Sequence, residues 1–254
     1  MKKIIIFLTI FFTIFVSLNI YFEKNYATPI LAYHSFDAAR IDTYAVVDPK
    51  AFRRQMEFIK RNGYKVIPLK KYCRFIANGR PVLKKTVVIT FDDGHADNLL
   101  IKKILQEFNY PVTIFLIRNK IGAKDYLSRR DINGFLKDVR LDLGSHTITH
   151  DYLPDLGSEA IKQEIFGSRQ RLQKIFGRPV LTIAYPTGGF NEEVLRFVKE
   201  AGYLCGCTTN RGFSKSLDRF ALQRIKITDR DTGFRLWAKL SGYYNVFRKP
   251  KKPY

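Results

Sequence analysis

The chain has 254 residues and a formal net charge of +21, from 44 Lys plus Arg against 23 Asp plus Glu. A hydrophobic fraction of 46% supplies a sizeable core, which excludes intrinsic disorder as the main state and fits one large domain. Only Cys73, Cys205 and Cys207 are cysteines, so the chain is not a disulfide scaffold. The charge suits either a nucleic-acid-binding protein or one beside an anionic membrane or wall polymer.

The first 22 residues have the pattern of a membrane anchor. Lys2 and Lys3 precede an apolar run from Ile4 to Phe22, which as a helix is about 28 Å long, close to the hydrocarbon thickness of a bilayer. No small-x-small cleavage pattern follows, which favours an uncleaved transmembrane signal anchor over a cleaved signal peptide or a buried core helix. Positive charge before the span places the body outside the cytoplasm and argues against a nucleic-acid partner.

Beyond a linker at residues 23–28, predicted strands and helices alternate. We expect strands at 30–33, 66–67, 86–91, 112–117, 139–144, 181–184, 203–208 and 222–227, and helices at 49–62, 69–77, 96–108, 158–176 and 192–201. Repeated strand–helix units predict an α/β fold with a parallel sheet, either open or closed into a barrel. Seven to eight strands favour an irregular or incomplete (β/α) barrel for the main domain, residues 29–233.

The C-terminal segment, residues 234–254, is amphipathic and basic. Its aromatic residues alternate with Arg and Lys, so it is either an interfacial helix that touches anionic lipid or a last helix packed on the barrel with a solvated tail, and the second reading is favoured. We interpret Cys205 and Cys207 as strand residues that point to opposite faces rather than as a metal or redox pair.

Residues with metal-binding or acid–base side chains gather where predicted strands end, the place where barrel enzymes hold their chemistry. They are His34, the pair Asp92-Asp93, and the pair His146 and His150, with Tyr185-Pro186-Thr187 following a later strand. Adjacent carboxylates cannot share one environment, so one is expected to bind a metal and the other to face a reacting water. Histidines four residues apart can reach the same ion, and one carboxylate with two imidazoles leaves an open position for water, as in catalytic sites.

Four stretches of this sequence resemble motifs of the NodB-type polysaccharide deacetylases, carbohydrate esterase family 4. They are Ile30–His34, Thr90–Gly94, Ser145–His150 and Ala184–Gly189. The resemblance extends from about residue 30 to residue 227 and is closest to the branch that acts on poly-N-acetylglucosamine, the intercellular-adhesin deacetylases.

The resemblance implies that Asp93, His146 and His150 hold a divalent metal, with zinc as first choice, and that Asp92 is the general base. The metal would lower the pKa of its bound water and polarise the acetamide carbonyl. A backbone N–H near Tyr185, Pro186 and Thr187 would help to hold the oxyanion. The products would be acetate and a free glucosamine unit.

Two departures from the family pattern concern the catalytic machinery. Ala184 and Thr187 stand where the family commonly has Arg and Tyr, and that arginine normally steadies the catalytic aspartate. We expect Arg224, on a late strand, to supply the missing charge. Because no histidine follows His150, we expect His34 to be the general acid, while His95 is expected to be exposed or to lie behind the metal ligands.

These features predict a membrane-anchored, extracytoplasmic and metal-dependent deacetylase of poly-N-acetylglucosamine at the cell envelope. The alternatives are a deacetylase of peptidoglycan or chito-oligosaccharides and a catalytically impaired barrel that only binds glycan. The excess positive charge would keep the body on an anionic membrane or wall polymer and repel the cationic product.

Overall fold

The computed structural model describes residues 2–24, 26–37, 45–80, 84–209 and 218–244. The α-helices are α1 (Lys2–Lys24), α2 (Pro49–Arg61), α3 (Leu69–Ala77), α4 (Lys102–Phe108), α5 (Arg129–Asp138), α6 (Ser158–Lys162), α7 (Ser168–Phe176), α8 (Glu192–Glu200) and α9 (Gly233–Leu240). The strands are β1 (Ile30–Tyr33), β2 (Lys65–Val66), β3 (Thr86–Phe91), β4 (Val112–Leu116), β5 (Leu141–Ser145), β6 (Thr182–Ala184), β7 (Cys205–Thr208), β8 (Leu222–Gln223) and β9 (Ile225–Lys226). Short 3₁₀ turns are η1 (Ala96–Ile101), η2 (Arg118–Lys120), η3 (Leu153–Asp155) and η5 (Pro186–Gly188), and η4 (Gln163–Gly167) is a π-helical turn.

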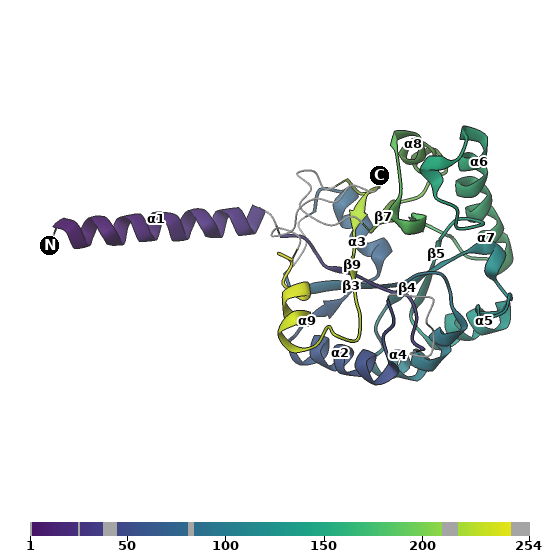
Figure 1. Ribbon diagram of the computed structural model, residues 1–254, viewed down its shortest axis with the longest axis horizontal. Helices are drawn as coiled ribbons and strands as arrows, with labels where there is room; N and C mark the ends of the chain where they lie inside the picture. The colour runs from purple at the N-terminus through teal and green to yellow at the C-terminus, as the bar shows by residue number, and fades with distance from the viewer. Residues whose placement is uncertain (1, 25, 38–44, 81–83, 210–217, 245–254) are drawn as a thin grey trace.

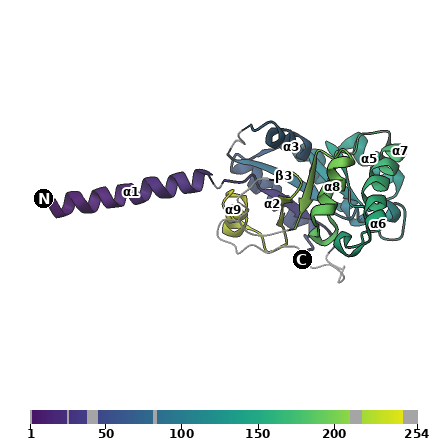
Figure 2. The ribbon, with the colours of Figure 1, turned by 90° about the horizontal axis from the view of Figure 1, so that it is seen from above.

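The main sheet is a parallel barrel that is nearly closed. Its strands follow the order β8-β7-β6-β5-β4-β3-β1-β9, and β2 pairs with β3 beside this path. The two end strands, β8 and β9, are separated in the chain by Arg224 alone, so the two edges of the sheet meet at this residue. Helices surround the strands in both views (Figures 1 and 2). The predicted α/β fold and incomplete barrel are therefore confirmed.

Local sequence signals account for most element boundaries. The apolar run of β3 is buried at every position, as expected for a strand covered on both faces. Helix α2 begins after Asp48, whose side chain accepts a hydrogen bond from the Lys50 backbone N–H, with Pro49 at the first helical position. The helix predicted at 158–176 is instead α6, η4 and α7 in sequence, because a π-turn interrupts it.

Alternate strand residues face the inside of the barrel, where they form a second apolar cluster apart from the main core under the outer helices. Helix α3 adds Leu69, Tyr72 and Cys73 to this interior cluster. It meets the first residues of β1 and β7, Ile30 and Cys205, in the same cluster. Helix α3 therefore closes the end of the barrel at which the strands begin.

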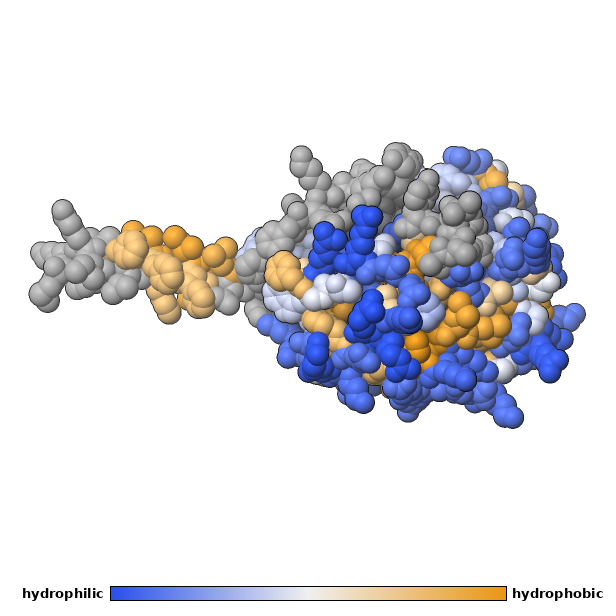
Figure 3. Space-filling view, turned by 60° about the horizontal axis from the view of Figure 1, so that its bottom comes forward, coloured by the Kyte–Doolittle hydropathy of each residue, from blue (hydrophilic) through white to orange (hydrophobic). Residues whose placement is uncertain are grey.

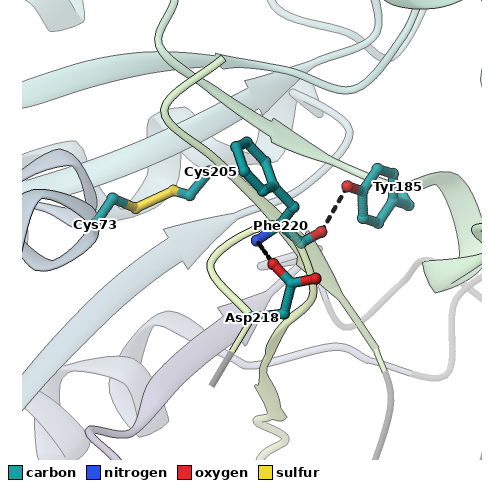
Figure 4. Close-up of a disulfide and its surroundings, with 5 residues drawn as sticks. All are labelled: Cys73, Tyr185, Cys205, Asp218 and Phe220. Carbon is teal, nitrogen blue, oxygen red and sulfur yellow. Dashed lines mark hydrogen bonds between the residues drawn. A yellow bond between two sulfur atoms is a disulfide. The ribbon is translucent and has the colours of Figure 1, made fainter. Parts of the chain in front are cut away.

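A disulfide joins Cys73 of α3 to Cys205 of β7 across 132 residues of sequence (Figure 4). Sequence reasoning missed this bond and placed Cys205 and Cys207 on opposite faces. That placement was wrong, because side chains alternate along a strand and residues two apart face the same side. Both cysteines lie in the interior cluster, and Cys207 is a buried free thiol whose pKa is raised to about 12 by burial.

Helix α1 extends away from the barrel, and most of its exposed side chains are apolar, with Phe7 and Phe12 about two-thirds exposed (Figures 1 and 3). Among the described residues, no helix is both long and apolar enough to cross a membrane. The predicted transmembrane span is therefore not supported.

Helix α9 packs on the barrel through Leu236 and Leu240, which are buried in the main core. Its other face presents Phe234 and Trp237 to solvent as a stacked pair. The Ala27 backbone N–H donates to the carbonyl of Gly242, which joins the start of the body to its end. The helix is thus packed on the barrel, while the basic tail over 245–254 lies outside the described residues.

Candidate active site

The predicted site residues meet at the end of the barrel where the strands finish. Asp92 and Asp93 directly follow β3, and His146 directly follows β5. The Asp92 backbone N–H donates to the carbonyl of Tyr33 at the end of β1, and that of His146 donates to Leu116 at the end of β4. Parallel pairing of the strands therefore brings these segments, which are far apart in the sequence, to the same end of the barrel. The predicted barrel has its site residues at this end.

Asp93, His146 and His150 form a cluster of metal-binding groups, and their ligand atoms all lie within 4.8 Å of one another. Oδ1 of Asp93 is 3.5 Å from Nε2 of His146 and 3.5 Å from Nε2 of His150. His146 Nδ1 is 2.8 Å from the carbonyl oxygen of Ala184. Because a carbonyl can only accept, Nδ1 carries the proton and Nε2 directs its lone pair at the cluster. One carboxylate and two imidazoles fit a divalent metal such as zinc.

The backbone of this metal-ligand cluster is in an unusual conformation. Asp93, Thr147 and His150 have φ values of 68°, 66° and 76°, in the left-handed region that residues with a β-carbon rarely adopt. Such positions occur where surrounding structure holds a functional geometry in place. Here the Thr147 side chain accepts a hydrogen bond from the His150 backbone N–H at 3.1 Å, which fixes the loop that carries both histidines.

A buried carboxylate, Glu164, anchors the loop between the two histidines. Its Oε2 accepts from the backbone N–H groups of Ile148 and Thr149 at 2.7 and 3.0 Å, and its Oε1 accepts from the Thr149 hydroxyl. Glu164 belongs to the π-turn η4, a local irregularity that is frequent at functional sites. Sequence reasoning missed it, although a glutamate between Ile161 and Ile165 on a buried helix face was a signal.

Asp92 is held by a bidentate ion pair with Arg224. The guanidinium Nη1 and Nη2 lie 2.6 and 2.7 Å from the two carboxylate oxygens, and both side chains are almost fully buried. Burial alone would raise the pKa of Asp92, but the Arg224 charge and the nearby His146 and His34 outweigh it and hold the pKa below its usual value. Arg224 reaches inward because it stands where β8 and β9 close the barrel. The position expected for this arginine is therefore the observed one.

The other histidines, His34 and His95, lie on either side of the aspartate pair. His34 Nε2 is 3.6 Å from Asp92 Oδ2, and its side chain is 24% exposed, so it faces the site as expected. Burial lowers the pKa of His34 despite the neighbouring carboxylates. His95 is buried rather than exposed and lies 3.3 Å from the second oxygen of Asp93, with its ring against Tyr126. It therefore orients the Asp93 carboxylate from behind.

The turn over 185–187 is placed differently from our expectation. The Tyr185 side chain is fully buried, and its hydroxyl donates to the carbonyl of Phe220 at 2.6 Å (Figure 4). It supports the turn from inside the protein and has no access to a substrate, which corrects its assignment as a substrate residue. Pro186 is also buried, whereas Thr187 is exposed with a positive φ of 53°. Its carbonyl accepts from the Thr209 hydroxyl, which holds the turn against β7.

A near-closed parallel barrel with an Asp-His-His cluster and a buried, paired carboxylate at its strand ends defines a candidate hydrolase site. The chain belongs to the polysaccharide deacetylase family, whose model matches residues 79–206. This confirms the family expected from the sequence motifs. The matched range includes the metal-ligand cluster and Asp92, whereas His34 and Arg224 lie outside it.

Three relatives illustrate the match. YxkH of Bacillus subtilis, named as a polysaccharide deacetylase, is 30% identical over 83% of this chain and 75% of its own. The poly-beta-1,6-N-acetyl-D-glucosamine N-deacetylase of Staphylococcus epidermidis is 26% identical over 74% of this chain and 70% of its own. The structure of the Streptococcus pyogenes deacetylase PplD with acetate has a TM-score of 0.77 and 25% identity, and covers 84% of this chain and 97% of its own.

Proposed function

We propose that this polysaccharide deacetylase removes acetyl groups from poly-β-1,6-N-acetylglucosamine with the help of a divalent metal, zinc being the first candidate. The observation that carries the proposal is the Asp93, His146 and His150 cluster beside an ionised Asp92 paired with Arg224. The similarity to the staphylococcal poly-N-acetylglucosamine deacetylases supports the choice of substrate.

The proposed roles follow from the geometry. A bound metal supplies Lewis acidity and lowers the pKa of a water molecule. Asp92, kept ionised by Arg224, takes a proton from the water that attacks the acetamide carbonyl. Burial lowers the pKa of His34, which favours its neutral form, and this imidazole accepts the proton from Asp92 and donates it to the leaving amine. A backbone N–H near Thr187 would face the developing oxyanion.

A second candidate function is a glycan-binding barrel without activity. The alanine at position 184, where the family commonly has arginine, favours it, because a catalytic aspartate without its cation would be less ionised. The Arg224 pair weighs against this candidate, since it supplies the same charge from the point where β8 and β9 meet.

We further propose that the body works outside the cytoplasm. The Cys73–Cys205 disulfide supports this location, because structural disulfides persist in oxidising compartments and are rare in the cytosol.

The test is acetate release from three acetylated glycans, namely a β-1,6-linked N-acetylglucosamine oligomer, a peptidoglycan fragment and a chito-oligosaccharide. Each is assayed after chelation and again after zinc is added back, with glycan binding measured in parallel. We expect zinc-restored release that is fastest with the β-1,6 oligomer and absent in His150→Ala. Faster release from another glycan would reassign the substrate, and binding without release under any metal would favour the inactive barrel.

Glu164→Gln is expected to weaken metal binding by about tenfold or more, in the range found for residues that orient metal ligands. The glutamine amide has the shape of the carboxylate but not its charge. It is therefore a weaker acceptor for the two backbone N–H groups, those of Ile148 and Thr149, that donate to Glu164. Zinc titration against a competing chelator measures this effect. Glu192→Gln, at the exposed start of α8, is the matched control, and equal zinc affinity in both variants would remove Glu164 from this role.

A further inference from the structure

A second polar pocket lies at the end of the barrel where the strands begin, opposite the metal-ligand cluster. Its volume is about 320 Å³. Helix α3 forms one wall, and the other is formed by the first residues of β4, β5 and β6 together with the segment 178–181 that precedes β6. The polar residues that line it are Lys70, Arg74, Thr113, Asp142, Arg178 and Thr182.

This pocket, called the basal pocket below, has more positive than negative side chains around it. Lys70 pairs with Asp142 at 2.6 Å between Nζ and Oδ1, which leaves the guanidinium groups of Arg74 and Arg178 as excess charge. Neither arginine forms an ion pair with another described residue, and both are exposed at the pocket. Two guanidinium groups facing one cavity form a natural receptor for a tetrahedral oxyanion.

Thr113 gives independent evidence that the pocket takes a ligand. The residue is 1% exposed and lines the pocket, but its hydroxyl has no hydrogen-bond partner among the described residues. The equivalent hydroxyl on the neighbouring strand, that of Thr90, donates to the carbonyl of Leu31. A buried hydroxyl without a partner is destabilising, and a ligand oxygen in the pocket would satisfy it.

The pocket is also firmly built. Helix α3, which supplies Lys70 and Arg74, is tied to β7 by the Cys73–Cys205 disulfide and packs its apolar side into the barrel. The charged wall is therefore held in place before any ligand arrives, which reduces the entropy lost on binding.

We propose that the basal pocket binds a phosphate group, with Arg74 and Arg178 pairing to its charged oxygens and Thr113 donating a hydrogen bond. N-acetylglucosamine polymer carries no phosphate, so this site is separate from the catalytic one. The phosphate would come either from a free phosphate ion or from a phosphodiester polymer of the envelope.

The experiment is calorimetric titration of the full-length protein with inorganic phosphate and, separately, with an oligomer of glycerol phosphate, at constant ionic strength. Saturable binding of either probe is expected to weaken about tenfold or more in Arg74→Gln/Arg178→Gln, because charge-assisted contacts are lost. The control, Arg61→Gln/Lys103→Gln, removes the same charge from exposed positions of α2 and α4 and should bind as the wild type does.

Thr113→Val gives a second readout. Without ligand this variant should melt at a higher temperature than the wild type, because it removes an unpaired buried hydroxyl, and phosphate should raise its melting temperature less. Equal binding by the pocket and control variants, or no saturable binding of either probe, would overturn the proposal. Binding of only one probe would support it and identify the source of the phosphate.

Discussion

Asp92→Asn will lower kcat for acetate release by about 10² to 10⁴, the usual contribution of a general base. Arg224→Met will lower it by about 10², because Asp92 loses both its bidentate partner and its exact orientation. The second variant will also lose about 3–5 kcal/mol of folding free energy, because it leaves a buried carboxylate without its cation. Acetate release and urea denaturation measure the two effects.

The pH profile separates the charge of Arg224 from a general loss of folding. Arg224 holds the pKa of Asp92 below its usual value against the opposing effect of burial. Removing the guanidinium must therefore raise that pKa, so the acidic limb of the kcat/KM profile will move to higher pH in Arg224→Met. Arg230→Met, an exposed residue nearby in the sequence, is the matched control and should keep the wild-type profile. An unshifted acidic limb in Arg224→Met would show that the pair does not tune the base.

A double variant isolates the interaction between the two side chains. Asp92→Asn/Arg224→Met removes both charges, so it should be more stable than Arg224→Met alone although it carries one more substitution. Additive losses of stability would contradict the buried ion pair.

Cys73→Ala/Cys205→Ala will lower the free energy of unfolding by about 3–5 kcal/mol, because the disulfide closes a long loop of chain and restricts the unfolded state. Reductant should destabilise the wild type by a similar amount and leave the double variant unchanged. Denaturation with and without reductant tests this directly.

Cys207→Ala is the matched control for the disulfide, since Cys207 is a buried thiol two residues from Cys205. This variant should keep its sensitivity to reductant. Thiol labelling of the unfolded wild type should detect one free cysteine, and three would mean that the disulfide does not form. Such a result would also remove the support for a location outside the cytoplasm.

The metal-ligand cluster could be predicted from sequence because its residues are close in the chain or follow strands directly. Asp93 comes two residues after the fully buried strand β3, and His146 and His150 share one short loop. Parallel strands place their carboxyl ends at the same edge, so the cluster follows from local pattern and one rule of topology.

The contributions of Glu164 and Cys73 could not be predicted in the same way. Glu164 acts through hydrogen bonds to backbone groups sixteen and fifteen residues earlier, and it lies in a π-turn that the helical pattern of the sequence does not predict. Cys73 reaches Cys205 only because α3 closes the base of the barrel. The place of Glu164 on a buried helix face indicates that it has a partner, but the sequence pattern does not identify that partner, and Cys73 leaves no signal of its own.

The sequence by itself determined the α/β class, the incomplete barrel, the polysaccharide deacetylase family and the residues of the metal-ligand cluster, because each depends on local periodicity and on motifs at strand ends. Tertiary structure alone decided how the barrel is closed. It sets the bidentate geometry of Arg224, which was expected beside Asp92 and lies between β8 and β9. It also turns Tyr185 into the protein and joins Cys73 to Cys205. These contacts join residues 35 to 132 positions apart, so they exist only once the sheet has curved back upon itself.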